Sequence, residues 1–196
     1  MKQVTAIVVG LLIAAFGLQA APAGVGQAGG GWTTLFDGSS LDGWNVLGDA
    51  NWTLEDDAVR ADSGRGFLVT PQSYGDFELT LEFWVDEPAN SGIFVRCADG
   101  QSVRDDNSYE VNIFDTRPDQ TYRTGGIVHF AAPTSVIHTG GRWNSYEIRA
   151  EGTRLTVRLN GTQTVDMNDS TYASGPIALQ YGAGVVKFRN VRIREL

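Results

Sequence analysis

The stretch "NSYEVNIFD", residues 107–115, places a carboxylate inside an otherwise apolar segment. Successive side chains of a β-strand point to opposite faces of a sheet. Tyr109, Val111 and Ile113 therefore share one face, which suits a protein core, whereas Glu110 and Asn112 share the other. This leaves two interpretations of the polar face: a solvated outer surface, or a surface that binds the hydroxyl groups of a sugar.

The same alternation places further polar side chains on one face of other segments. In "NSGIFVRC", Asn90 and Arg96 lie opposite the apolar face, and "GGIVHFA" and "GPIALQYG" contribute His129 and Gln180. If these strands are neighbours, one concave sheet surface collects Arg96, Glu110, Asn112, His129 and Gln180. Such a set offers a base, a cation and hydrogen-bonding groups for a sugar ring.

Each of these groups also has a purely structural interpretation. Glu110 and Arg96 would then form an exposed cross-strand ion pair, which contributes about 0–1 kcal/mol. Asp115 would cap the turn after its strand, and His129 would be a structural histidine. The chain has two histidines, His129 and His138, which limits any metal site to a mixed or carboxylate-rich one.

Short alternating runs divided by Gly, Asn, Asp and Pro indicate the elements that must position these groups. They favour an all-β fold in which two antiparallel sheets pack on one core. The turn signals "EGTR" and "NG" predict a three-stranded meander over residues 145–167. The polar loop "TRPDQTYRTGG", residues 116–126, is long for a hairpin, and a functional loop and a plain surface excursion are equally compatible with it.

The N-terminal segment has the pattern of a secretory signal peptide over residues 1–23, followed by a Gly-rich lead-in over residues 24–31. Residues 32–196 then form a single domain, and we expect it to be secreted or periplasmic, with no membrane association after signal cleavage. The net charge is −8 and no basic stripe occurs, which argues against nucleic acid and favours a neutral sugar as partner. The only cysteine, Cys97, excludes an intrachain disulfide.

Several motifs follow one another in a familiar order: "WTTLFDGSSLDGW", "YGDFELTLEF", "NSGIFVR", "YEVNIFD", "TGGIVHF", "RWNSYEIRAEG" and "GPIALQYGAGVVKFRNVRIREL". Together they resemble the 3-keto-disaccharide hydrolase family, also described as 3-keto-glucoside lyases and hydratases, over residues 32–196. The resemblance implies a concanavalin-like jelly-roll sandwich that degrades carbohydrate through 3-keto sugars. It also implies that a separate sugar 3-oxidoreductase makes the ketone upstream.

The resemblance carries over to named positions. The residues that match the family pattern are Asn90, Arg96, Glu110, Asp115, Asn144, Gln180 and Arg189. The chain departs from the pattern at Asn112, where members often have Gln, and at Gly182, where they often have His. The second departure keeps a non-catalytic, lectin-like carbohydrate-binding module as the alternative to an enzyme.

The implied chemistry begins with a ketone at C3, which acidifies the proton on C2 and allows β-elimination of the C1 substituent. Glu110 or His129 would be the base, and Arg96 would stabilise the enolate or orient Glu110. The expected substrate-binding residues are Asn90, Asn112, Asp115, Asn144, Gln180 and Arg189. The one cofactor considered is a divalent metal held by Glu110, Asp115 and His129. An ordinary glycosidase mechanism is disfavoured because Glu110 and Asp115 fall on opposite strand faces.

Overall fold

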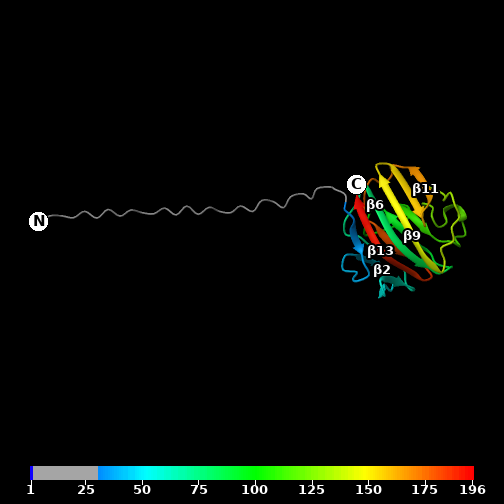
Figure 1. Cartoon of the computed structure of the whole chain (residues 1–196), viewed down its shortest axis with the longest axis horizontal. Helices are drawn as coiled ribbons and strands as arrows, with labels where there is room; N and C mark the ends of the chain where they lie inside the picture. The colour runs from blue at the N-terminus through cyan, green and yellow to red at the C-terminus, as the bar shows by residue number, and fades with distance from the viewer. Residues whose placement is uncertain (2–30) are drawn as a thin grey trace.

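The computed structural model describes residue 1 and residues 31–196, which form β-strands without an α-helix (Figure 1). The predicted signal peptide and lead-in lie outside the described residues, apart from residues 1 and 31. The earlier strands are β1 Thr33–Phe36, β2 Asn45–Gly48, β3 Thr53–Glu55, β4 Ala58–Ala61, β5 Gly66–Val69, β6 Phe77–Val85 and β7 Ser91–Val95. The later elements are β8 Tyr109–Ile113, the 3₁₀ turn η1 Gln120–Tyr122, β9 Arg142–Glu151, β10 Arg154–Leu159, β11 Thr162–Asn168, β12 Ala178–Tyr181 and β13 Val186–Glu195.

The strands form two antiparallel sheets. The eight-stranded sheet has the order β11-β10-β9-β6-β13-β4-β3, with β1 paired to β13, and the five-stranded sheet has the order β2-β5-β12-β7-β8. One hydrophobic core contains side chains of both sheets, such as Phe83 of β6 and Val111 of β8. The predicted two-sheet sandwich is therefore confirmed.

Alternating burial along the strands places each apolar face toward this core. In β6 every second residue from Phe77 to Val85 is buried, as the sequence pattern predicts. The meander is also confirmed, since β9 pairs with β10 and β10 pairs with β11. Asn160 and Gly161 join β10 to β11 with φ angles of 50° and 78°, the positive values that a tight two-residue hairpin turn requires.

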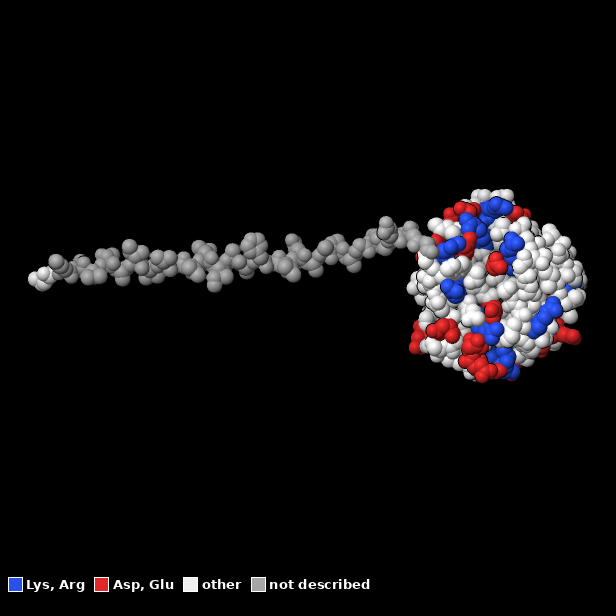
Figure 2. Space-filling model, in the orientation of Figure 1, with Lys and Arg blue, Asp and Glu red and all other residues white. Residues whose placement is uncertain are grey.

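The outer face of the eight-stranded sheet is a solvated surface of paired charges. Figure 2 shows acidic and basic side chains lying beside one another on the face where Figure 1 places β6, β9 and β13. Glu78 of β6 pairs with Arg149 of β9 and Arg194 of β13. No helix within the described part of the chain has the length and apolarity needed to span a bilayer.

The outer face of the five-stranded sheet is partly covered instead. A second apolar cluster lies on this side, away from the main core, and contains Val69, Phe94, Cys97, Val103 and Ala178. Val103 comes from the loop between β7 and β8, so this loop closes one side of the sheet surface. The sheet and its covering loops together form a cavity on this side.

Candidate functional site

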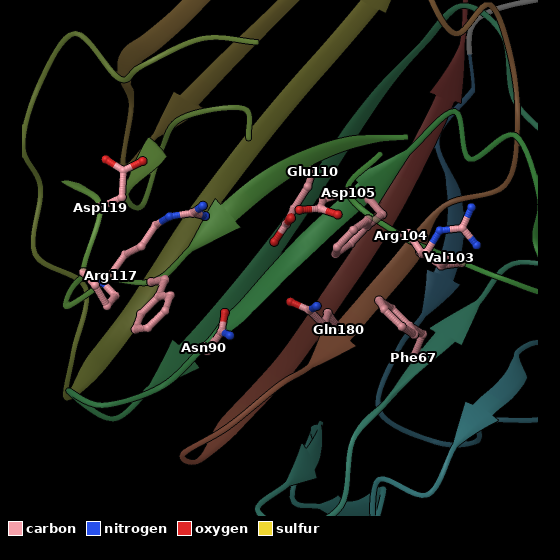
Figure 3. Close-up of a pocket in the computed structure, with 12 residues that line it drawn as sticks. Phe67, Asn90, Val103, Arg104, Asp105, Glu110, Arg117, Asp119 and Gln180 are labelled. Carbon is pink, nitrogen blue, oxygen red and sulfur yellow. The ribbon is translucent and has the colours of Figure 1, made fainter. Parts of the chain in front are cut away.

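A cavity of about 570 Å³ opens on the outer face of the five-stranded sheet (Figure 3). This volume lies within the range of small-molecule sites, about 300–1,000 Å³. Its floor comes from β5, β7, β8 and β12, and its sides come from the β7–β8 loop and the loop after β8. The polar side chains that line it are Asn90, Arg104, Asp105, Glu110, Arg117, Asp119 and Gln180.

Glu110 is the buried carboxyl group of this cavity. It lies on β8 opposite Phe94 of β7, and its side chain extends over Gly92, where a Cβ atom would lie 2.9 Å from Glu110 Oε1 and 3.0 Å from its Cγ. Only 7% of Glu110 is exposed. Burial raises the pKa of Glu110 to about 8, Asp105 adds to the rise and Arg117 opposes it. A carboxyl group with a pKa near neutrality can accept a proton and return it.

Two amide side chains share the cavity with Glu110. Gln180 projects from β12 and Asn90 precedes β7, and Figure 3 shows both beside the space that Glu110 faces. The Oε1 atom of Gln180 is buried and has no hydrogen-bond partner among the described residues. An unpartnered amide oxygen facing a cavity is suited to accept a hydrogen bond from a ligand hydroxyl.

Gly182 also packs against Asn90, and this close contact explains why a residue without a side chain occupies position 182. A Cβ atom at Gly182 would lie 2.8 Å from the Asn90 carbonyl oxygen and 3.2 Å from Asn90 Nδ2. The backbone here has no room for the His that members of the resembled family often carry at this position. Asn90 and Gln180 therefore line the cavity here, and the residue that follows β12 contributes no imidazole.

The loop after β8 adds a cation to the cavity. Arg117 lines it together with Pro118 and Asp119, and the salt bridges among the described residues do not include Arg117. Gln120 holds this loop by donating hydrogen bonds to the carbonyl oxygens of Asp115 and Arg117. The loop over residues 116–126 therefore forms part of the cavity wall.

Asp105 connects His129 to the cavity. Asp105 lines the cavity, and its Oδ2 lies 3.0 Å from His129 Nε2. The segment that carries His129 is a tight turn, in which the Phe130 and Ala131 amides both donate to the Ile127 carbonyl oxygen. His129 has a φ of 69° and an exposed side chain. The prediction that His129 lies on the same surface as Glu110 is therefore wrong. His129 is connected to the cavity only through its hydrogen bond to Asp105.

Arg96 does not enter the cavity, so the prediction that it joins Glu110 there is wrong. β7 ends at Val95, and Arg96 has a φ of 52°, which breaks the strand alternation. Its guanidinium donates to four acceptors: the carbonyl oxygens of Gly75, Gly152 and Tyr172 and a carboxylate oxygen of Asp76. Arg96 is 1% exposed, and it pairs with Asp76 rather than with Glu110. It therefore holds loops together instead of contacting the cavity.

Asn112 and Asp115 also stabilise loops instead of lining the cavity. Asn112 is buried, and its Nδ2 donates to the Tyr122 carbonyl oxygen. The carboxylate of Asp115 accepts hydrogen bonds from the backbone amides of Thr139 at 2.6 Å and Gly140 at 3.3 Å. The expectation that these two residues bind substrate beside Glu110 does not agree with this geometry.

Asn144 and Arg189 belong to the eight-stranded sheet, whereas the cavity lies on the five-stranded sheet. Asn144 of β9 donates to the Thr139 carbonyl oxygen at 2.9 Å. Arg189 of β13 lies 4.0 Å from the centre of the Trp143 ring and 2.6 Å from a carboxylate oxygen of Glu82. Strand alternation predicts the face of a residue but not its sheet, so the expectation that both bind substrate in one pocket is wrong.

The predicted metal ligands are not brought together. Glu110 lines the cavity, Asp115 caps the segment at Thr139, and His129 is held by Asp105. Within residues 31–196, no group of three or more His, Cys, Asp or Glu side chains has the arrangement of a metal site. The ionisable side chains that line the cavity around Glu110 are those of Asp105 and Arg117.

The sequence did not single out several of the cavity residues, among them Asp105, Arg117 and Phe67. Arg117 lies in the long polar loop that the sequence marks as unusual, so loop length was the available signal. Asp105 and Phe67 carry no such signal, because a charged loop residue and a half-buried strand aromatic are common in any sandwich.

The fold is that of a concanavalin-like jelly-roll protein, with a cavity on the outer face of one sheet. The beta-glucanase of Bacillus licheniformis shares the fold, with a TM-score of 0.61 at 12% identity over 85% of this chain and 99% of that one. The model of one family, the 3-keto-alpha-glucoside-1,2-lyase-like domain, matches residues 31–194. The chain belongs to this family.

Two relatives agree with this family. A 3-keto-disaccharide hydrolase of Bacteroides thetaiotaomicron is 32% identical over 77 residues, which cover 33% of this chain and 27% of that protein. The match thus spans about a quarter of the relative's length. A crystal structure of a candidate glycosyl hydrolase from Parabacteroides distasonis has a TM-score of 0.72 at 26% identity, over 85% of this chain and 100% of that one. These findings indicate a protein similar to 3-keto-disaccharide hydrolases and glycosyl hydrolases.

Proposed function

We propose that this protein cleaves 3-keto-glycosides by removing the C2 proton and expelling the C1 substituent. The observation that carries the proposal is a buried carboxyl group, Glu110, facing a cavity that also holds the Arg117 guanidinium, which has no ion pair within residues 31–196. The family supports the substrate class. The substrate is then a neutral oxidised sugar, made by an upstream sugar 3-oxidoreductase, and the reaction takes place outside the cytoplasm after signal cleavage.

The first step is proton transfer from C2 to the Glu110 carboxylate. The electron pair left on C2 is delocalised into the C3 carbonyl as an enolate. When the enolate collapses, a double bond forms between C1 and C2, the C1–O bond breaks, and the leaving oxygen takes a proton. The products are an alcohol and a 2-hydroxy-3-keto-glycal. Addition of water across the new double bond, with a proton returning to C2, makes the net reaction a hydrolysis.

Arg117 stabilises the enolate in this scheme, in place of Arg96. Its guanidinium already interacts favourably with the Glu110 carboxylate, since it lowers the pKa of Glu110 against the larger effect of burial. When the proton moves to Glu110, the negative charge moves to the substrate, and the same cation remains close to it. A preorganised group that faces developing charge contributes about 10²–10³-fold in rate.

Glu110, which has taken the C2 proton, returns that proton to the leaving oxygen, and Asp105, which is hydrogen-bonded to His129 at 3.0 Å, accepts a hydrogen bond from a sugar hydroxyl beside it. Figure 3 shows Asp105 beside Glu110 in the cavity. Asn90 and Gln180, on the cavity floor, bind sugar hydroxyls. A base, a proton donor and a cation are then all present without a metal-dependent step.

A pair of matched substrates tests the proposal. We expect the purified domain to release the alcohol from a 3-keto-glucoside without added nicotinamide, and to leave the corresponding unoxidised glucoside intact. Release is measured chromatographically for both substrates, with Glu110→Gln as the inactive control. Similar affinity for both glucosides with turnover of neither would instead establish the lectin-like binding module and reject the enzyme.

A further inference from the structure

We infer that the cavity contains a separate subsite for the leaving group, built from Phe67, Phe94 and Val103. This subsite selects 3-keto-glycosides whose leaving group has an aromatic or other apolar face, in preference to a second sugar. The inference deepens the proposed function and rests on it, because the two ends of the cavity are assigned through the elimination chemistry.

The apolar end of the cavity belongs to the second hydrophobic cluster, outside the main core. Phe94 and Val103 are buried members of this cluster, and Phe67 packs against it while remaining partly exposed. The Phe67 and Phe94 rings meet edge to face, with centroids 5.3 Å apart at 89°. All three residues line the cavity, so an apolar platform adjoins the polar groups around Glu110.

The two ends of the cavity differ in the charge available to a substrate. Figure 3 shows Phe67 and Val103 on one side of Glu110 and Arg117 on the other. The nearest cation at the apolar end, Arg104, is already engaged: its guanidinium lies 2.9 Å from Asp106 and 2.7 Å from Ser102. Two cations line the cavity, Arg104 and Arg117. Arg117, the one without an ion pair within residues 31–196, therefore lies at the end opposite Phe67 and Val103.

The chemistry then determines the direction of the substrate. C2, which reacts with Glu110, is bonded to C3 on one side and to C1 on the other. The oxygen on C3 carries the developing charge, so C3 lies toward Arg117. C1 and its leaving group consequently extend toward Phe67 and Val103, past Asp105.

The apolar wall is fixed before a ligand arrives. The Arg104 amide donates to Asn107 Oδ1 at 2.9 Å, and Asn107 Nδ2 donates to the Ser102 carbonyl oxygen at 2.7 Å. These hydrogen bonds hold the turn that presents Val103. A preformed apolar wall binds a flat apolar group at low ordering cost, whereas the hydroxyls of a second sugar would lose water hydrogen bonds there without replacement.

Phenyl and methyl 3-keto-glucosides of the same anomeric configuration test the subsite. The quantity measured is the ratio of kcat/KM for the phenyl substrate to that for the methyl substrate, in the native protein, Phe67→Ala and Phe67→Leu. Comparing each variant with the native protein cancels the intrinsic difference between the leaving groups. We expect Phe67→Ala to lower the ratio about tenfold and Phe67→Leu to lower it less. Trp32→Ala, on the opposite sheet, is the matched aromatic control and leaves the ratio unchanged.

Calorimetry measures how tightly the unoxidised phenyl and methyl glucosides bind. This tests the subsite even if neither keto substrate is turned over. We expect the native protein to prefer the phenyl glucoside and Phe67→Ala to lose that preference. If this holds while neither keto substrate reacts, the subsite stands and the proposed reaction fails. A native protein with no preference for the phenyl group, or a Phe67→Ala effect of equal size on both glucosides, would overturn the subsite.

Discussion

Replacing Glu110 with Gln separates the proposed catalytic role of this residue from its effect on stability. The carboxyl group is buried, and burial raises its pKa from 4.5 to about 8. Gln has nearly the shape of the protonated carboxyl group and carries no charge at any pH. We therefore expect the variant to lose activity by at least about 10²-fold and to be more stable than the native protein at alkaline pH.

The sign of the stability effect follows from proton binding. Between pH 4.5 and about 8, the folded state keeps the Glu110 proton that the unfolded state releases. The free energy of unfolding therefore decreases as the pH rises through this window, and the full loss is reached above about pH 8. At 1.36 kcal/mol for each pKa unit, the loss is up to about 5 kcal/mol. For a domain of this size, this corresponds to a Tm difference of up to about 10–20 °C.

Urea unfolding of the native protein and of Glu110→Gln at pH 5, 7 and 9 measures this difference. Glu78→Gln is the matched control, because it has the opposite sign. Burial raises the pKa of Glu78, but its hydrogen bonds to Arg194 and Arg149 lower it by more. The control variant should therefore be less stable than the native protein by a similar amount at pH 5, 7 and 9, because the stabilisation by the Glu78 carboxylate is lost only below pH 4.5. A Glu110→Gln variant that is less stable than the native protein at pH 9, or whose stability difference is independent of pH, would refute the reasoning.

Three further outcomes are expected. The kcat/KM of the native protein should rise with pH through an apparent pKa of about 8, measured between pH 6 and 10, since Glu110 must be ionised to act as the base. Arg117→Gln should lower kcat about 10²-fold and move this limb to higher pH, because Arg117 lowers the pKa of Glu110; unchanged kinetics would remove Arg117 from the mechanism. Arg96→Met should lower the free energy of unfolding in urea by about 1–3 kcal/mol, because the carbonyl oxygens of Gly75, Gly152 and Tyr172 and a carboxylate oxygen of Asp76 lose this donor. A strong loss of kcat in the folded Arg96 variant would contradict its structural assignment.

Strand alternation was sufficient to predict the sheets and the side of β8 that holds Glu110. Tyr109, Val111 and Ile113 are in the main core, as their spacing indicates, and Glu110 faces the opposite side. Gln180 reaches the same cavity because β12 pairs with β7, which pairs with β8. A period of two residues is reliable wherever the backbone remains extended.

The same rule fails where the backbone leaves the extended region or where the partner strand is unknown. Arg96 and His129 have positive φ angles, so their side chains no longer follow the alternation of the preceding residues. Arg189 follows the alternation but lies on β13, which belongs to the other sheet. Non-local strand pairing and a single left-handed residue leave little trace in the local pattern, so these positions required the structure.

The surroundings of Glu110 explain why a carboxylate occupies an apolar strand. An ionised group that is buried without a full set of partners lowers the stability of the fold, and here the loss grows between pH 4.5 and about 8. Gly92 on the neighbouring strand leaves the space into which the Glu110 side chain extends, and a glycine within a strand also weakens that strand. A structural ion pair would require a cation in direct contact, yet Arg96 pairs with Asp76, and Glu110 is absent from the salt bridges within residues 31–196. Folding alone does not explain two neighbouring positions that both reduce stability, whereas the proposed role of Glu110 as a base that faces an open cavity accounts for the carboxyl group and for the space that Gly92 leaves for it.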